Sequence, residues 1–133
     1  MTKEYITWQD VEIFVDQIAE AYADMPPAGV YGVPRGGLVL AVMISHRLAI
    51  PLLQAPFDNC LIVDDIINTG ETIAHFDRMG YDIATLCLGA ESTVKPKLFY
   101  KMREADWITY PWEYTQGSSI KDADDYFKAW EDK

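Results

Sequence analysis

Apolar residues recur along the chain at helical spacing in some segments and in short unbroken runs in others, and this alternation predicts the secondary structure. After Thr7, whose hydroxyl is placed to cap a helix, apolar side chains follow at helical spacing until Pro26 and Pro27 end the pattern. The predicted helices span residues 8–23, 38–48, 71–79 and 122–131. Short apolar runs predict strands at residues 29–33, 51–53, 60–63 and 83–88, with an edge strand at residues 107–110. Residues 91–104 show no clear pattern.

This order of elements predicts an α/β fold. Strands that alternate with helices are typical of a doubly wound, mainly parallel sheet flanked by helices, and 133 residues allow one core, so we expect a single domain over residues 1–133. In such sheets, ligands bind beyond the carboxyl ends of the strands, where loops lead into helices. The loops of residues 34–37 and 64–72 have this position, and we expect the functional site between them.

Charge and composition narrow the classes of function. The formal net charge is −10 and there is no basic stripe to displace counterions from a phosphate backbone, so we expect no nucleic-acid partner. The apolar stretches are too short to span a bilayer and no leader pattern precedes the first helix, so we expect a cytoplasmic protein without a membrane partner. Cys60 and Cys87 lie in strand-like apolar runs, which favours reduced core thiols. A small phosphorylated ligand remains compatible, because it requires only local donors or a cation.

The loop after the strand at residues 60–63 carries the sharpest chemical signal. Asp64 and Asp65 come first, and carboxylates at a strand end suit sugar hydroxyls or a hydrated Mg²⁺ ion, so both are candidate metal ligands. Backbone N–H groups, threonine hydroxyls and the dipole of the expected helix then predict a concave phosphate site. The residues of this phosphate loop are Asn68, Thr69, Gly70, Glu71 and Thr72. Alternatively, the paired acids are simply solvated, or hold a metal in another doubly wound fold.

This segment resembles the phosphoribosyl pyrophosphate signature of type I phosphoribosyltransferases, in which a hydrophobic strand, two acids, two variable residues and a Thr-Gly-x-Thr turn follow one another. The resemblance covers most of the chain and is closest to bacterial xanthine-guanine and hypoxanthine phosphoribosyltransferases, with a shortened hood and without their catalytic loop. Three further segments match in the same order: Trp8-Gln9-Asp10-Val11, Arg35-Gly36-Gly37-Leu38-Val39 and Trp107-Ile108-Thr109-Tyr110-Pro111-Trp112-Glu113. The resemblance implies phosphoribosyl pyrophosphate and a nucleobase or nucleoside monophosphate as ligands, Mg²⁺ as cofactor, and a homo-oligomer, either dimer or tetramer.

The resemblance also implies roles for single residues. Arg35 and the amides of Gly36 and Gly37 would hold the pyrophosphate, in a loop that often has a cis peptide bond just before the arginine. Trp107 would stack on the purine ring, and the backbone of Ile108 would read the purine edge. The implied catalytic residues are Asp64, Asp65, Asn68 and Arg35. From the residues alone, Arg35 as an ordinary surface charge and Trp107 as core packing remain alternatives.

The chain departs from the family pattern at three places. Asn68 stands where the purine enzymes carry an aspartate that meets the attacking purine nitrogen, and an amide cannot act as a base. Gly89 falls near the position of the lysine that recognises the purine oxygen, and Lys95 and Lys97 are candidates to replace that lysine. Only residues 54–59 separate two strands where the relatives insert a long hairpin and a mobile loop, so water would reach the reacting centre.

Three functions are compatible with these observations. The leading hypothesis is a purine phosphoribosyltransferase that transfers the phosphoribosyl group to xanthine, guanine or hypoxanthine and releases pyrophosphate. The second is a non-catalytic sensor that binds phosphoribosyl pyrophosphate or a nucleotide on the same fold. The third, an interaction protein on a decayed fold, is disfavoured by the intact Thr69-Gly70-Glu71-Thr72 turn.

Overall fold

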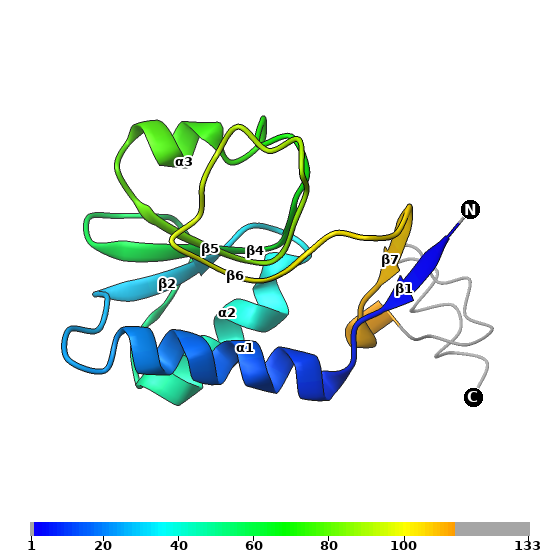
Figure 1. Cartoon of the computed structure of the whole chain (residues 1–133). Coiled ribbons are helices and arrows are strands. Elements are labelled where there is room, and N and C mark those ends of the chain that lie inside the picture. The colour runs from blue at the N-terminus through cyan, green and yellow to red at the C-terminus, as the bar shows by residue number, and fades with distance from the viewer. Residues whose placement is uncertain (1, 114–133) are drawn as a thin grey trace, which may run out of the picture.

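The computed structural model describes residues 2–113 and shows a five-stranded parallel sheet with helices on both faces (Figure 1). The helices are α1 (Trp8–Ala21), α2 (Gly37–Leu48), α3 (Ala74–Arg78) and the 3₁₀ helix η1 (Pro111–Glu113). The strands are β1 (Lys3–Tyr5), β2 (Gly29–Gly32), β3 (Leu52–Leu53), β4 (Cys60–Ile67), β5 (Asp82–Leu88), β6 (Leu98–Met102) and β7 (Trp107–Thr109). No helix within residues 2–113 is long and apolar enough to cross a membrane.

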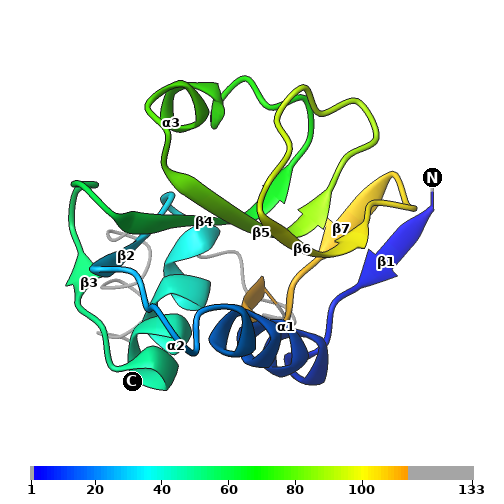
Figure 2. The same cartoon turned by 60° about the vertical axis from the view of Figure 1, so that its left-hand side comes forward.

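The strand order of the main sheet is β3-β2-β4-β5-β6, and every neighbouring pair is parallel. Helices α1 and α2 cover one face of this sheet and α3 lies over the other, as the two views show (Figures 1 and 2). β1 and β7 form a separate two-stranded parallel sheet beside it. The expected doubly wound α/β fold is therefore confirmed.

Strand β4 is buried on both faces because its side chains alternate between two apolar clusters. Leu61 and Val63 pack in the larger cluster with Phe14 and other residues of α1 and α2. Ile62 packs on the opposite face, in the smaller cluster that includes Ile73. This two-sided burial explains the unbroken apolar run at the start of β4 and fixes its direction in the middle of the sheet. Cys60 and Cys87 are both buried free thiols, as expected.

Several predicted elements differ from the structure. β4 continues to Ile67, so Asp64 and Asp65 lie inside the strand and not in a turn; the two acids interrupt the apolar pattern that would have revealed its length. β6 was not predicted, because it is a partly exposed edge strand with a mixed sequence. The segment at residues 107–110 is no edge of the main sheet, since β7 pairs with the short strand β1. The helix expected at residues 122–131 lies outside the described residues.

Helix α1 begins at a complete capping box formed by two residues. The Asp10 N–H donates to the Thr7 hydroxyl at 3.1 Å, and the Thr7 N–H donates to the Asp10 carboxylate at 2.8 Å. The same carboxylate accepts from the Tyr100 hydroxyl at 2.7 Å, which ties the start of α1 to β6. The predicted cap is confirmed, and it fixes the helix that supports one face of the sheet.

Replacing Thr7 with alanine removes the side-chain acceptor for the Asp10 N–H. We expect Thr7→Ala to lower the free energy of unfolding by about 1 kcal/mol, measured by urea denaturation followed by circular dichroism. Thr7→Ser keeps the hydroxyl and is the matched control, with an unfolding midpoint close to that of the unmodified chain. Equal destabilisation by both substitutions would contradict the capping role.

Candidate functional site

A cavity of about 390 Å³ lies where the loop after β2 meets the end of β4. Its walls come from Val33, Pro34 and Gly36 and from residues 64–73. Among the predicted site residues, those that line it are Gly36, Asp64, Asp65, Asn68, Thr69, Gly70, Glu71 and Thr72. The structure therefore brings together the paired acids and the whole phosphate loop, as the order of strands predicted.

The loop between β2 and α2 approaches β4 so closely that only glycine fits. A Cβ atom on Gly36 would lie 2.1 Å from the Asp65 carboxylate, and one on Gly37 would lie 2.4 Å from the Val63 carbonyl oxygen. The peptide bond between Pro34 and Arg35 is cis, as the resemblance implied. Arg35 itself is exposed and is not part of the cavity wall.

The two loop glycines differ in their backbone hydrogen bonding. The Gly37 N–H already donates to the Val33 carbonyl at 2.9 Å, and Gly37 does not line the cavity. Gly36 does line it. Of the two glycines expected to bind a ligand, Gly36 therefore lines the cavity and Gly37 begins α2.

The paired acids lie half-buried in the cavity wall without a basic partner among residues 2–113. The Asp64 carboxylate accepts a hydrogen bond from the Asp65 backbone N–H at 2.8 Å. Burial, and then the neighbouring Asp65 carboxyl group, raise the pKa of Asp64 to about 8. A cation in the cavity would offset this cost of ionising Asp64, so the pair suits a hydrated divalent ion.

The protein side chains alone do not complete a metal site, because the described residues contain no group of three or more acidic, histidine or cysteine side chains that could hold a metal. Asp64 and Asp65 would therefore bind a metal ion together with water or ligand oxygens. Mg²⁺ commonly binds in this way, with one or two carboxylates and substrate phosphates completing its shell.

The phosphate loop is a turn and not the start of a helix. Gly70 has φ +92°, and the Glu71 N–H donates to the Thr69 hydroxyl at 3.3 Å, a local bond that competes with helix formation. Helix α3 begins only at Ala74 and has five residues, so the prediction of a helix from residue 71 was wrong. The expected helix dipole is correspondingly small, so an anion in this loop would be bound by the loop amides and hydroxyls.

A second segment braces the phosphate loop from outside. Thr93 donates to the Thr69 carbonyl through its backbone N–H at 3.0 Å and through its hydroxyl at 3.2 Å. A Cβ atom on Gly70 would lie 3.1 Å from Val94, which is buried in the smaller apolar cluster. The loop is thus held in its turn conformation by contacts that leave the side chains of Thr69 and Thr72 exposed.

A neighbouring cavity of about 300 Å³ shares Asn68 with the first one. The other residues that line it are Gly89, Ala90, Glu91, Arg103, Ala105 and Asp106. Arg103 donates to the Asn68 side-chain oxygen at 2.6 Å and to the Ala105 carbonyl at 2.8 Å. No sequence pattern pointed to Arg103, because it follows the edge strand β6 in the segment without a clear pattern.

Gly89 packs directly against the backbone of Asn68. A Cβ atom on Gly89 would lie 2.7 Å from the Asn68 carbonyl oxygen and 3.0 Å from its Cα atom. A lysine at position 89 therefore cannot be accommodated without moving the phosphate loop. The close contact accounts for glycine at this position.

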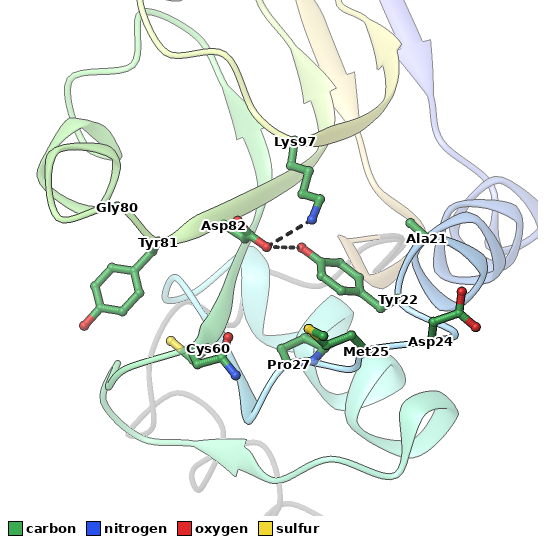
Figure 3. Close-up of a pocket in the computed structure, with 11 residues that line it drawn as sticks. Ala21, Tyr22, Asp24, Met25, Pro27, Cys60, Gly80, Tyr81, Asp82 and Lys97 are labelled. Carbon is green, nitrogen blue, oxygen red and sulfur yellow. Dashed lines mark hydrogen bonds and ion pairs between the residues drawn. The ribbon is translucent and has the colours of Figure 1, made fainter.

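Lys97 lies at the opposite end of the sheet and does not replace the family lysine. Its ammonium group is 3.3 Å from the Asp82 carboxylate and 4.6 Å from the centre of the Tyr22 ring, while the Tyr22 hydroxyl donates to Asp82 at 2.7 Å (Figure 3). These three residues line a third cavity, of about 270 Å³, next to the amino end of β5. Lys95 is exposed and lines neither cavity at the carboxyl ends of the strands, so neither lysine lies in the cavity where a replacement for the family lysine would be needed.

Trp107 and Ile108 lie beside the second cavity without lining it. Trp107 is 58 % exposed, which excludes core packing, and it directly follows Asp106 of the cavity wall.

Trp112 packs against the larger apolar cluster and stacks on Tyr110 with 5.1 Å between ring centres. The Tyr110 hydroxyl donates to the Asp65 backbone carbonyl at 3.0 Å, a contact to the acid pair that the sequence did not reveal.

Comparison with solved structures identifies similar proteins, although no protein-family model matches the sequence. A purine phosphoribosyltransferase from Pyrococcus horikoshii Ot3 has a TM-score of 0.73 and 30% identity, over 92% of this chain and 100% of that chain. The xanthine-guanine-hypoxanthine phosphoribosyltransferase of Helicobacter pylori has a TM-score of 0.69 and 16% identity, over 98% of this chain and 99% of that chain. A hypothetical protein from Neisseria gonorrhoeae with bound ppGpp has a TM-score of 0.66 and 16% identity, over 87% of this chain and 92% of that chain. The last two likenesses show the fold.

Placing a lysine at position 89 tests the contact between Gly89 and Asn68. We expect Gly89→Lys to lower the free energy of unfolding by about 1–3 kcal/mol, because the new Cβ atom collides with backbone. Ala90→Lys, at the adjacent exposed position, is the matched control and should change stability by less than about 0.5 kcal/mol. Urea denaturation of both variants provides the comparison, and equal midpoints would contradict the close packing.

Proposed function

Because the chain belongs to the type I phosphoribosyltransferase family, we propose that it transfers the phosphoribosyl group of phosphoribosyl pyrophosphate to a purine-type base. Xanthine, guanine and hypoxanthine are the proposed acceptors, and pyrophosphate is the second product. The observation that carries this proposal is the single cavity lined by Gly36, by Asp64 and Asp65, and by the phosphate loop. This cavity combines hydrogen-bond donors for a phosphate with carboxylates for sugar hydroxyls or a cation, and a phosphorylated sugar requires both.

The phosphate loop is proposed to bind the 5′-phosphate of the ribose. The backbone N–H groups of Thr69, Gly70 and Thr72 donate to no acceptor within residues 2–113, and the two threonine side chains are exposed at the cavity. The positive φ of Gly70 permits a turn in which successive amides can face one concavity. These donors match the oxygens of a phosphate dianion.

Asp64 and Asp65 are proposed to bind the ribose hydroxyls and Mg²⁺. Their side chains line the cavity between the phosphate loop and the glycine loop, and no basic residue of the described chain neutralises them. When bound, Mg²⁺ would offset the negative charge that develops on the pyrophosphate leaving group. The Gly36 amide and the exposed Arg35 guanidinium are proposed to bind the same pyrophosphate from the loop side.

The proposed reaction depends on positioning and electrostatics. A ring nitrogen of the base forms a bond to the anomeric carbon while the bond to pyrophosphate breaks; the electron pair leaves with pyrophosphate, and the proton of the base passes to water. Positive charge that builds on the ribose is stabilised by the Asp64 and Asp65 carboxylates. Asn68 cannot remove a proton, so the reaction proceeds without a protein base at this position.

Neutralising either acid tests the proposed reaction. With labelled phosphoribosyl pyrophosphate, Mg²⁺ and each of the three oxopurines in turn, we expect a nucleotide product. Asp64→Asn and Asp65→Asn should lower the rate by roughly 10²-fold, because each removes a charge that stabilises the transition state. Asp58→Asn, at an exposed position before the amino end of β4, is the matched control with an unchanged rate. No nucleotide with any base would contradict the proposal.

A second function is favoured by one structural observation. β3 ends at Leu53 and β4 begins at Cys60, so residues 54–59 connect the two strands directly, where the family resemblance implies a long hairpin and a mobile loop. A chain that retained the phosphate loop but not this cover would act as a non-catalytic sensor of phosphoribosyl pyrophosphate or a nucleotide. Calorimetric binding of either ligand, together with the absence of turnover in the assay above, would select this function over transfer.

A further inference from the structure

Tyr110 is a buried side chain whose position is fixed by several contacts. It is 4 % exposed and packs in the larger apolar cluster. Its ring stacks on Trp112 with 5.1 Å between ring centres and 5° between ring planes, and its backbone N–H donates to the Glu113 carboxylate at 2.9 Å. The Tyr110 hydroxyl is therefore held in one place, because neither the ring nor the backbone that carries it is free to turn.

The Tyr110 hydroxyl reaches the half of β4 that carries the acids. It donates to the Asp65 backbone carbonyl at 3.0 Å, across 45 residues of the chain. The pairing of β2 with β4 ends at Val63, so within residues 2–113 no strand pairs with Asp64 and Asp65 on that edge. The hydrogen bond from Tyr110 thus adds to the pairing with β5 at the place where β4 loses its other neighbour.

The backbone of Asp65 links this hydroxyl to both carboxylates. The Asp65 N–H donates to the Asp64 carboxylate at 2.8 Å, and Asp65 itself lines the first cavity. Gly36 approaches the Asp65 carboxylate so closely that a Cβ atom on this glycine would lie 2.1 Å from it. A shift of Asp65 would therefore disturb both acids, and the hydrogen bond from Tyr110 opposes that shift.

The phosphate loop is held by a different set of contacts. Thr93 donates to the Thr69 carbonyl through its backbone N–H at 3.0 Å and through its hydroxyl at 3.2 Å, and neither contact involves Tyr110 or the acids. Loss of the Tyr110 hydroxyl should therefore disturb the carboxylates and leave the anion donors of the loop in place. The change should reduce what a cation contributes to ligand binding and leave the contribution of the phosphate unaltered.

We propose that Tyr110 is a positioning residue, which holds Asp64 and Asp65 in the arrangement that binds a divalent cation together with a phosphorylated sugar. The inference rests on the proposed function, because it takes the first cavity as the place of that cation and sugar. Tyr110 directly follows β7, which lies beside the main sheet (Figure 1), so the same residue attaches this strand to the acid pair.

The test measures the affinity for phosphoribosyl pyrophosphate by calorimetry with and without Mg²⁺, and the ratio of the two dissociation constants is the Mg²⁺ enhancement. Tyr110→Phe keeps the stacked ring and removes only the hydroxyl. We expect this variant to fold, to bind as the unmodified chain does when Mg²⁺ is absent, and to show an enhancement about 5-fold smaller, as the loss of one hydrogen bond predicts. Tyr100→Phe is the matched control, because it removes a hydroxyl that donates to Asp10 at 2.7 Å at the start of α1, and it should retain the enhancement.

A chain that carries both Asp64→Asn and Asp65→Asn distinguishes an action through the acids from any other effect of Tyr110. In that chain, the addition of Tyr110→Phe should leave both affinities unchanged, because no carboxylate remains to be positioned. A further loss of affinity there would overturn the inference. An enhancement that Tyr110→Phe retains, or that Tyr100→Phe lowers equally, would overturn it while leaving the proposed function intact. Failure of the unmodified chain to bind phosphoribosyl pyrophosphate with Mg²⁺ would instead count against the proposed function, and the inference would fall with it.

Discussion

The site depends on the close approach of the glycine loop after β2 to the carboxyl half of β4. Val63, Asp64 and Asp65 lie so near Gly36 and Gly37 that even a methyl group at either glycine would overlap backbone or carboxylate atoms. Because β4 is buried on both faces and paired on both edges, it cannot shift to relieve such a collision. The contact therefore sets the distance between the glycine loop, which is proposed to bind pyrophosphate, and the two acids on β4.

The cavity has carboxylates on one side and hydrogen-bond donors on the other, and this arrangement limits which ligands fit it. The acid pair is half-buried without a basic partner in the described chain, and burial raises the pKa of Asp64 to about 8. The phosphate loop on the other side of the cavity presents amide and hydroxyl donors. A ligand that has anionic groups together with a bound cation or hydroxyl groups complements this arrangement. A simple anion would be repelled by the carboxylates.

The sequence predicted those parts of the molecule whose residue types report their environment directly. The position of the cavity could be predicted from three such features: the apolar run at the start of β4, the glycines after β2 and the Thr-Gly-Glu-Thr turn. The predicted start of a helix at residue 71 was wrong. The Thr69 hydroxyl and the positive φ of Gly70 stabilise a turn there, which helix propensity alone does not reveal. Arg103 and Tyr110 were missed for a different reason. Their contacts with Asn68 and Asp65 span 35 and 45 residues along the chain, and no local pattern encodes such pairings.

Calorimetric titration of the chain with phosphoribosyl pyrophosphate, in the presence and absence of Mg²⁺, tests whether one cavity holds both the metal and the phosphorylated sugar. We expect saturable binding with one ligand per chain and an affinity that rises when Mg²⁺ is present, since the ion offsets the charge of Asp64 and Asp65. Binding that is absent under both conditions, or that Mg²⁺ does not affect, would contradict it.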